Sequence, residues 1–279
     1  MLLSCSSTHH SGTAKAMPGT WQSTPIIIDG DSKDWPSPYP NYDAKAKVAY
    51  ATSNDGQNLY ITMQTGDEAT QLKILKQGMT VSIDTNGKKE AQFNINYPLQ
   101  NDNEPLDLAK PDRGQENKSQ LARKQSEQKI TRLLQDANQF TMDGFANCSG
   151  GYMISQTLPC GVKVRARIDE FRELVWEAVI PFRVLYNRDS IVGSDARRPI
   201  SVCYQVKGFK ANGPKNDNGA NTAGMNNGMG GAGTNSAMRN GIGQIPRGRG
   251  GSRNSSDDPM HHYYETTKTW KQFGIAVKP

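Results

Sequence analysis

The chain has 279 residues, of which 35% are hydrophobic and 22% charged, and its formal net charge is +6. No run of about 18 apolar residues occurs, so the composition excludes a membrane-spanning helix. None of the cysteines lies in a C-x-x-C pair, which argues against a zinc ribbon or a thioredoxin-type redox site.

The first five residues, Met1 to Cys5, read M-L-L-S-C. This pattern resembles the lipobox of bacterial lipoproteins, although no basic region and only a short apolar run precede the cysteine. The resemblance implies that Cys5 carries palmitate-type acyl chains and that residues 1–19 are a signal remnant and tether. The residues after Cys5 lack an acidic cluster, so we expect an anchor in the cell outer membrane on its periplasmic face.

Alternating apolar and polar residues predict short β-strands over the next part of the chain. Asn54, Asp55 and Gly56 separate two of these runs and predict a hairpin. The predicted strands cover residues 25–30, 47–52, 58–63, 80–84 and 92–97.

The pattern then changes to residues that favour helices, over about 112–140. A thin apolar stripe at helical spacing predicts a surface helix over 115–138, inserted between strands. The stripe consists of Leu121, Ile130, Leu133, Leu134 and Ala137. Predicted strands resume at 151–157, 162–168, 173–180, 199–208 and 269–277.

A segment rich in Gly and Asn, about 208–258, lies before the last predicted strand. It has too few apolar residues to offset the entropy of ordering it, so we expect a disordered loop. Most of the net positive charge of +6 lies in and beside this segment, since 207–258 hold seven Lys or Arg against three Asp, a net of +4. A shaped basic face is therefore not expected.

Together these elements predict an all-β fold, an antiparallel β-sandwich of jelly-roll type with one inserted surface helix and one long disordered loop. Residues 20–279 form its single domain. The prediction requires that alternating apolar residues face inward and seal two sheets together, with Ile83 and Ile180 among them.

Four motifs in chain order resemble carbohydrate-binding modules of family 9. They are I-I-I-D-G with D-W over 26–35, V-A-Y with D-G-Q-N-L-Y-I over 48–61, V-S-I-D-T-N-G over 81–87, and V-W-E-A-V-I-P-F over 175–182. The resemblance implies a sandwich over 24–208, closed by 268–278, and a carbohydrate as partner. The Gly/Asn/Met-rich insertion resembles those of exported proteins from Bacteroidetes-type bacteria.

Modules of that family hold sugars on exposed aromatic rings while polar side chains bond the hydroxyls. The alternative for both tryptophans is burial, Trp35 capping the core and Trp176 sharing a face with apolar neighbours. The Pro-rich loop 36–42 would present its rings on a stiff backbone, or simply cross the edge of the sandwich. The candidate ligand-binding residues are Trp35, Tyr39, Tyr42, Asn54, Gln57 and Trp176.

Three aspartates, Asp29, Asp31 and Asp34, offer the hard oxygen ligands that calcium prefers. Family relatives often carry structural calcium, so the resemblance makes these residues candidate ligands. Their spacing is not that of an EF-hand, and ordinary turn aspartates are the alternative.

Export to an oxidising compartment makes Cys148 and Cys160 a candidate disulfide around a short loop. Cys203 lies in an apolar strand-like run, which indicates a buried thiol.

No enzyme is predicted. The sequence has no G-x-S-x-G, phosphate-loop or H-E-x-x-H motif. Asp169, Glu170 and Glu177 flank strands and are interpreted as surface charges. A single R-G-R-G-G segment over 247–251, without interleaved aromatic residues, argues against nucleic acid as a partner.

These observations favour a non-catalytic, carbohydrate-binding-like module on a membrane-anchored exported protein. The alternative is a structural or assembly protein of the cell envelope, in which the sandwich, the helix 115–138 and the Gly-rich loop contact other proteins. An exposed apolar stripe on the helix would favour the alternative, and an exposed aromatic platform would favour sugar binding.

Overall fold

The computed structural model describes residues 16–99, 116–188, 191, 193–210 and 261–278, with the backbone alone for 116–123. Residues 1–209 and 262–279 belong to one compact unit. Residues 210–261 form a second, in which only Lys210 and His261 are described. The architecture below is that of the first unit.

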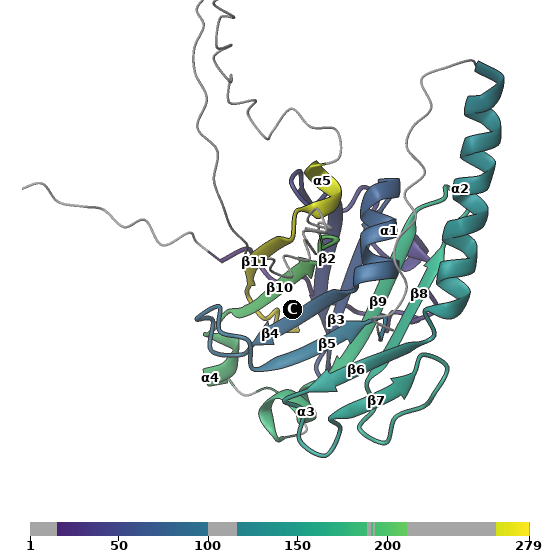
Figure 1. Cartoon of the computed structure of the whole chain (residues 1–279). Coiled ribbons are helices and arrows are strands. Elements are labelled where there is room, and N and C mark those ends of the chain that lie inside the picture. Colours follow the sequence, from purple (N-terminus) through teal and green to yellow (C-terminus); the bar gives the residue numbers. More distant parts are fainter. Residues whose placement is uncertain (1–15, 100–115, 189–190, 192, 211–260, 279) are drawn as a thin grey trace, which may run out of the picture. The chain divides into compact units, whose positions relative to one another are not determined.

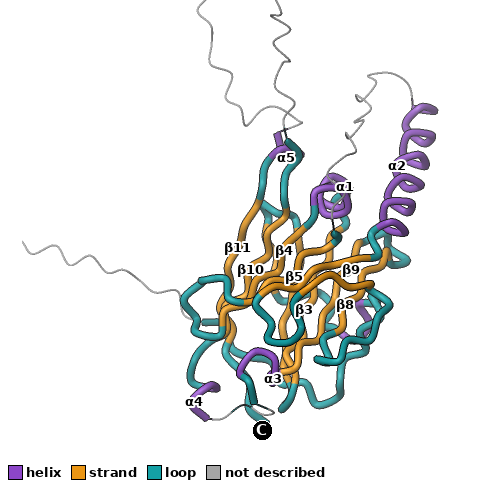
Figure 2. Tube along the Cα trace, turned by 60° about the horizontal axis from the view of Figure 1, so that its bottom comes forward, coloured by secondary structure: helices purple, strands orange, loops and turns teal. Residues whose placement is uncertain are grey.

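Two antiparallel sheets pack against each other in this unit (Figures 1 and 2). The five-stranded sheet has the order β1-β2-β3-β9-β8 and the six-stranded sheet the order β11-β10-β4-β5-β6-β7. The first comprises β1 (Asn41–Asp43), β2 (Val48–Asn54), β3 (Asn58–Thr65), β8 (Lys163–Ile168) and β9 (Leu174–Pro181). The second comprises β4 (Met79–Asp84), β5 (Phe93–Tyr97), β6 (Gln139–Asp143), β7 (Gly150–Met153), β10 (Ile200–Val206) and β11 (Thr267–Phe273).

Helices lie near both ends of the sandwich. In both views α1 and α2 lie near one end, whereas α3 and α4 lie near the other (Figures 1 and 2). The helices are η1 (Ser32–Asp34, a 3-10 turn), α1 (Glu68–Gln77), α2 (Glu116–Asp136), α3 (Phe182–Tyr186), α4 (Gly193–Ala196) and α5 (His261–Tyr264).

The core lies between the two sheets and is built by side chains that alternate along each strand. Ile61, Ile83, Trp176 and Ile180 are wholly buried in it. The two antiparallel sheets with a shared core confirm the predicted all-β sandwich. Ile83 and Ile180 are buried in that core, as the prediction requires. No helix among the described residues is long and apolar enough to cross a bilayer.

The predicted helix over 115–138 is confirmed as α2, and its apolar stripe is used inside the molecule. Ile130 and Ala137 are buried, and Leu133 and Leu134 pack against the core. The side chain of Leu121 lies outside the described part of the helix. Since β6 begins at Gln139, the helical insertion ends earlier than predicted.

Several elements differ from the predictions. Residues 25–30 form no strand, because the backbone N–H groups of Asp29 and Gly30 bond a side chain of β9 instead of a neighbouring strand. Helix α1 was not predicted, although Asp67 caps its first turn and Gly78 ends it at φ 83°. The short strands β1 and β6 were not predicted either.

The tether predicted over 1–19 is too long at its C-terminal end. The Met17 N–H donates to the Gln272 carbonyl over 2.8 Å, and the Met17 carbonyl accepts from Gly274 N–H over 2.7 Å. Residue 17 is therefore part of the sheet region. Cys5 and most of the predicted loop 208–258 lie outside the described residues.

Cys148 and Cys160 form a disulfide that ties the β6–β7 loop to the segment before β8, with Cα atoms 6.1 Å apart. Cys203 is a free thiol buried in β10. Burial raises the pKa of this thiol to about 11, so it stays protonated and unreactive at neutral pH.

Candidate functional site

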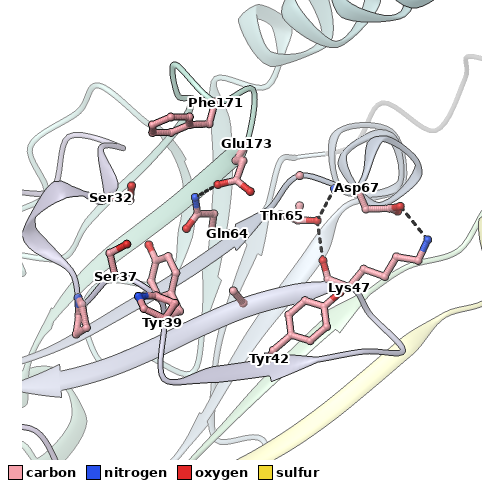
Figure 3. A pocket seen from close by; sticks show the side chains of 14 residues that line it. Ser32, Ser37, Tyr39, Tyr42, Lys47, Gln64, Thr65, Asp67, Phe171 and Glu173 are labelled. Carbon is pink, nitrogen blue, oxygen red and sulfur yellow. Dashed lines mark hydrogen bonds and ion pairs between the residues drawn. The ribbon is translucent and has the colours of Figure 1, made fainter.

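A groove of about 580 Å³ lies at one end of the five-stranded sheet, where β2 begins and β3 ends (Figure 3). The Pro-rich loop 36–39 forms one wall, and the turn between β8 and β9 contributes Phe171 and Glu173. Because β3 pairs with β9 so that Thr65 faces Leu174, residues far apart in the chain meet here.

Three aromatic rings line the groove. Phe171 and Tyr42 are 76% and 63% exposed, which is unusual for rings of this size. Tyr39 is half-buried, packs on the small cluster around Trp35, and its hydroxyl lies 3.2 Å from Thr62 Oγ1. In Figure 3 the polar ends of Gln64 and Glu173 lie between the rings of Phe171 and Tyr39.

The polar groups of the groove are held in fixed positions. Gln64 Nε2 donates to the Glu173 carboxylate and lies 3.5 Å from Asp169 Oδ2. Burial, with repulsion from Asp169, raises the pKa of Glu173 despite that hydrogen bond. On the other side, Lys47 Nζ lies 2.8 Å from Asp67 Oδ2, so this cation and anion neutralise each other.

The turn that presents Phe171 is fixed by hydrogen bonds on both sides. Asp169 Oδ1 accepts from the N–H groups of Phe171 and Glu173 over 2.9 and 2.8 Å. The buried Gln71 of α1 donates to the Arg172 carbonyl over 2.8 Å, and Glu127 of α2 pairs with the Arg172 guanidinium. Both helices therefore bind the turn at Arg172, next to the exposed Phe171.

The prediction that Trp35 and Trp176 stack on a sugar is wrong, because both side chains are buried. Trp176 is 0% exposed in the core, and Trp35 is 5% exposed beneath the loop 26–34. Neither indole presents a face to a ligand. Tyr39 and Tyr42, the predicted rings of the Pro-rich loop, do line the groove.

The predicted polar partners Asn54 and Gln57 do not lie in the groove. Both are at the β2–β3 turn, whereas the groove is at the opposite end of that hairpin. Asn54 is buried, and its side chain donates to the Ala276 carbonyl over 2.9 Å and accepts from Ala276 N–H over 2.8 Å. Its role is to hold the C-terminal segment.

The three candidate calcium ligands each satisfy a local backbone group. Asp29 accepts from Asp31 N–H, Asp31 from Lys33 N–H, and Asp34 from Ile27 N–H, over 2.8, 3.1 and 2.9 Å. Within the described ranges no group of three His, Cys, Asp or Glu side chains is arranged to hold a metal. Calcium binding here stays a prediction.

Glu177 was interpreted as a surface charge, and this is wrong. It is 0% exposed on β9. Its carboxylate accepts from Trp35 Nε1 over 2.5 Å and from the Gly30 and Asp29 N–H groups over 2.7 and 3.2 Å. The sequence did contain a signal for this burial. Glu177 stands inside a continuous apolar run, and such runs are typical of strands that are buried on both faces.

Glu177 makes stability depend on pH. Burial, opposed by its hydrogen bonds, raises the pKa of Glu177 from 4.5 to about 7. Between these values the folded chain binds more protons than the unfolded chain, so the free energy of unfolding falls as pH rises through this window, by about 3 kcal/mol. Urea unfolding of the wild type should show this fall, and Glu177→Gln should lack it. Equal pH slopes for the two proteins would contradict the assignment.

The fold and the groove define a β-sandwich domain with a surface site of exposed rings beside fixed hydrogen-bonding groups. No family model and no curated protein matches the chain. Among solved structures, it is similar to a carbohydrate-binding module of family 9 from Caldicellulosiruptor kristjanssonii in complex with glucose, with 10% identity over 71% of this chain and 80% of that chain and a TM-score of 0.32. The same kind of module in complex with cellotriose has 11% identity over 69% and 76%, and a TM-score of 0.30. These distant similarities assign neither a family nor a ligand.

Proposed function

We propose that the chain is a non-catalytic carbohydrate-binding module that holds a glycan in the groove between the Pro-rich loop and the β8–β9 turn. One observation carries the proposal: Phe171 exposes its ring beside the fixed carboxamide of Gln64 and carboxylate of Glu173, and Tyr42 exposes a second ring in the same groove. The C–H face of a sugar packs on such a ring, and its hydroxyls bond amide and carboxylate groups.

The acidic groups of the groove support binding rather than catalysis, because each already has a structural role. Asp67 caps α1 and Glu173 accepts from Gln64, while Asp169, which lies beside the groove, closes the turn before Glu173. A general acid or base needs a free position facing the reacting atom. On the described part of α2, Ile130 is buried and Leu133 and Leu134 pack against the core, which takes up much of the apolar stripe that the scaffold alternative requires.

A glycan array with the full 279-residue chain, run with and without EDTA, tests the proposal. We expect binding to a defined set of glycans. Silence across the array would overturn it. Weaker binding in EDTA would support the structural calcium proposed for Asp29, Asp31 and Asp34.

The chain is further proposed to be an exported protein anchored through Cys5 to the periplasmic face of the outer membrane. The sequence pattern around Cys5 is the support for this. Radiolabelled palmitate should enter the protein in cells and should not enter Cys5→Ser; equal labelling of both would contradict the anchor.

Replacing Phe171 by alanine should weaken glycan binding about tenfold, because one exposed stacking ring is lost. Ile27→Ala is the matched control, since Ile27 is 64% exposed but does not line the groove. Calorimetric titration with the tightest array ligand gives both affinities. Equal losses in the two variants, or none in Phe171→Ala, would place the site elsewhere.

A further inference from the structure

A second hollow, of about 140 Å³, adjoins the groove. Ser32 and Phe171, both labelled in Figure 3 on the first groove, line both hollows and therefore lie where the two meet. Phe171 is 76% exposed there. The second hollow has about a quarter of the volume of the groove, so it suits one small ring rather than a chain.

The floor of the second hollow is built by a close approach of two backbone segments. Gly30 has φ +84°, and a Cβ there would lie 2.7 Å from Arg167 Cβ. Only glycine therefore lets the loop before η1 contact β8 at Arg167. The Gly30 N–H is at the same time held by buried Glu177, which fixes this floor to the core.

The second hollow differs from the groove in its chemistry. Arg167 brings a guanidinium with five N–H donors in a fixed plane. Opposite charges come from Asp31, whose pKa is lowered by its hydrogen bond from Lys33, and from Glu170. Charged groups of both signs in this solvent-open hollow can donate hydrogen bonds to, and accept them from, the hydroxyls of a neutral sugar.

We propose that the two hollows are consecutive subsites of one glycan site, so that the ligand is a neutral oligosaccharide of at least two residues that lies across Ser32 and Phe171. The inference rests on the proposed function and adds the length of the ligand. The groove takes one end of the oligosaccharide, and Arg167 binds the hydroxyls of the next residue in the second hollow.

The test compares mono-, di- and trisaccharides of three neutral series, the cello-, xylo- and manno-oligosaccharides, by calorimetric titration with the full chain. In the series that binds, the trisaccharide should bind about tenfold more tightly than the monosaccharide, because hydrogen bonds to a charged group are added. Arg167→Ala should remove this gain, so that the trisaccharide and the monosaccharide bind with similar affinity. Lys163→Ala is the matched control, since Lys163 is exposed on the same face of β8 but lines neither hollow.

The outcomes separate the two proposals. Equal affinity for all lengths, or an equal loss for all lengths in Arg167→Ala, would overturn the second subsite while leaving the groove as the binding site. A gain with length that persists in Arg167→Ala would overturn the role of this hollow. Absence of binding in all three series would overturn the neutral ligand class, and silence on the glycan array would overturn the proposed function with it.

Discussion

Replacing Glu177 by alanine is expected to lower the free energy of unfolding by about 3–5 kcal/mol. The change leaves the Trp35 indole N–H and the Gly30 N–H buried without an acceptor, and it removes a third bond from Asp29 N–H. Release of the buried charge offsets part of this cost, so the total stays below the sum of three separate bonds. The loop 26–35 should also detach from β9.

Urea unfolding at neutral pH measures this effect, with Glu90→Ala as the control because Glu90 is exposed. Trp35→Phe removes the indole N–H and part of the buried ring, so it should cost about 1 kcal/mol through the lost bond and more through the cavity that it leaves. If Glu177→Ala unfolds within about 1 kcal/mol of Glu90→Ala, the carboxylate does not hold the loop to the core.

Removing the Cys148–Cys160 disulfide is expected to cost about 3 kcal/mol, because the unfolded chain regains the freedom of a loop that spans a sequence separation of 12. The double variant Cys148→Ala and Cys160→Ala keeps small apolar side chains at both positions. Cys148 is buried beside the core, so a small packing loss adds to the entropic effect.

Reductant provides the control for this second prediction. Thermal unfolding of the wild type should shift downward in dithiothreitol to the value of the double variant, whereas the double variant should not respond. Cys203 is present in both proteins and has no disulfide partner, so it does not confuse the comparison. A wild type that is insensitive to reductant would mean that the bond contributes nothing to stability.

The sandwich was predictable because its strands carry strong local signals. The alternation in β2, β3, β4 and β10 and the turn at Asn54–Gly56 are readable from neighbouring residues alone. Helix α1 carried signals too, with Asp67 before it and Gly78 after it, but its residues Leu72, Ile74 and Leu75 are buried on more than one side and gave no clean stripe.

The groove was predictable only in part. Tyr39 and Tyr42 stand in a loop whose prolines are visible in the sequence, whereas Phe171, Gln64 and Glu173 come together through the register of β3 with β9. That register is a property of the whole sheet. The burial of Trp35 could not be read from its neighbours in the sequence, because its indole bonds Glu177, 142 positions away.

The long helix α2 belongs to a connection that leaves the sheet after β5 and rejoins it at β6, at the same place. Strands β5 and β6 on either side of it pair directly, and the Leu99 N–H bonds the Gln139 carbonyl over 2.8 Å. A short hairpin connection would therefore close the sheet without the helix. The same helix forms an ion pair with Arg172, next to the exposed Phe171, through Glu127. A deletion of the helix would remove this ion pair and make the β8–β9 turn more mobile. The ligand selectivity of the site should therefore change under conditions in which the sandwich is still folded.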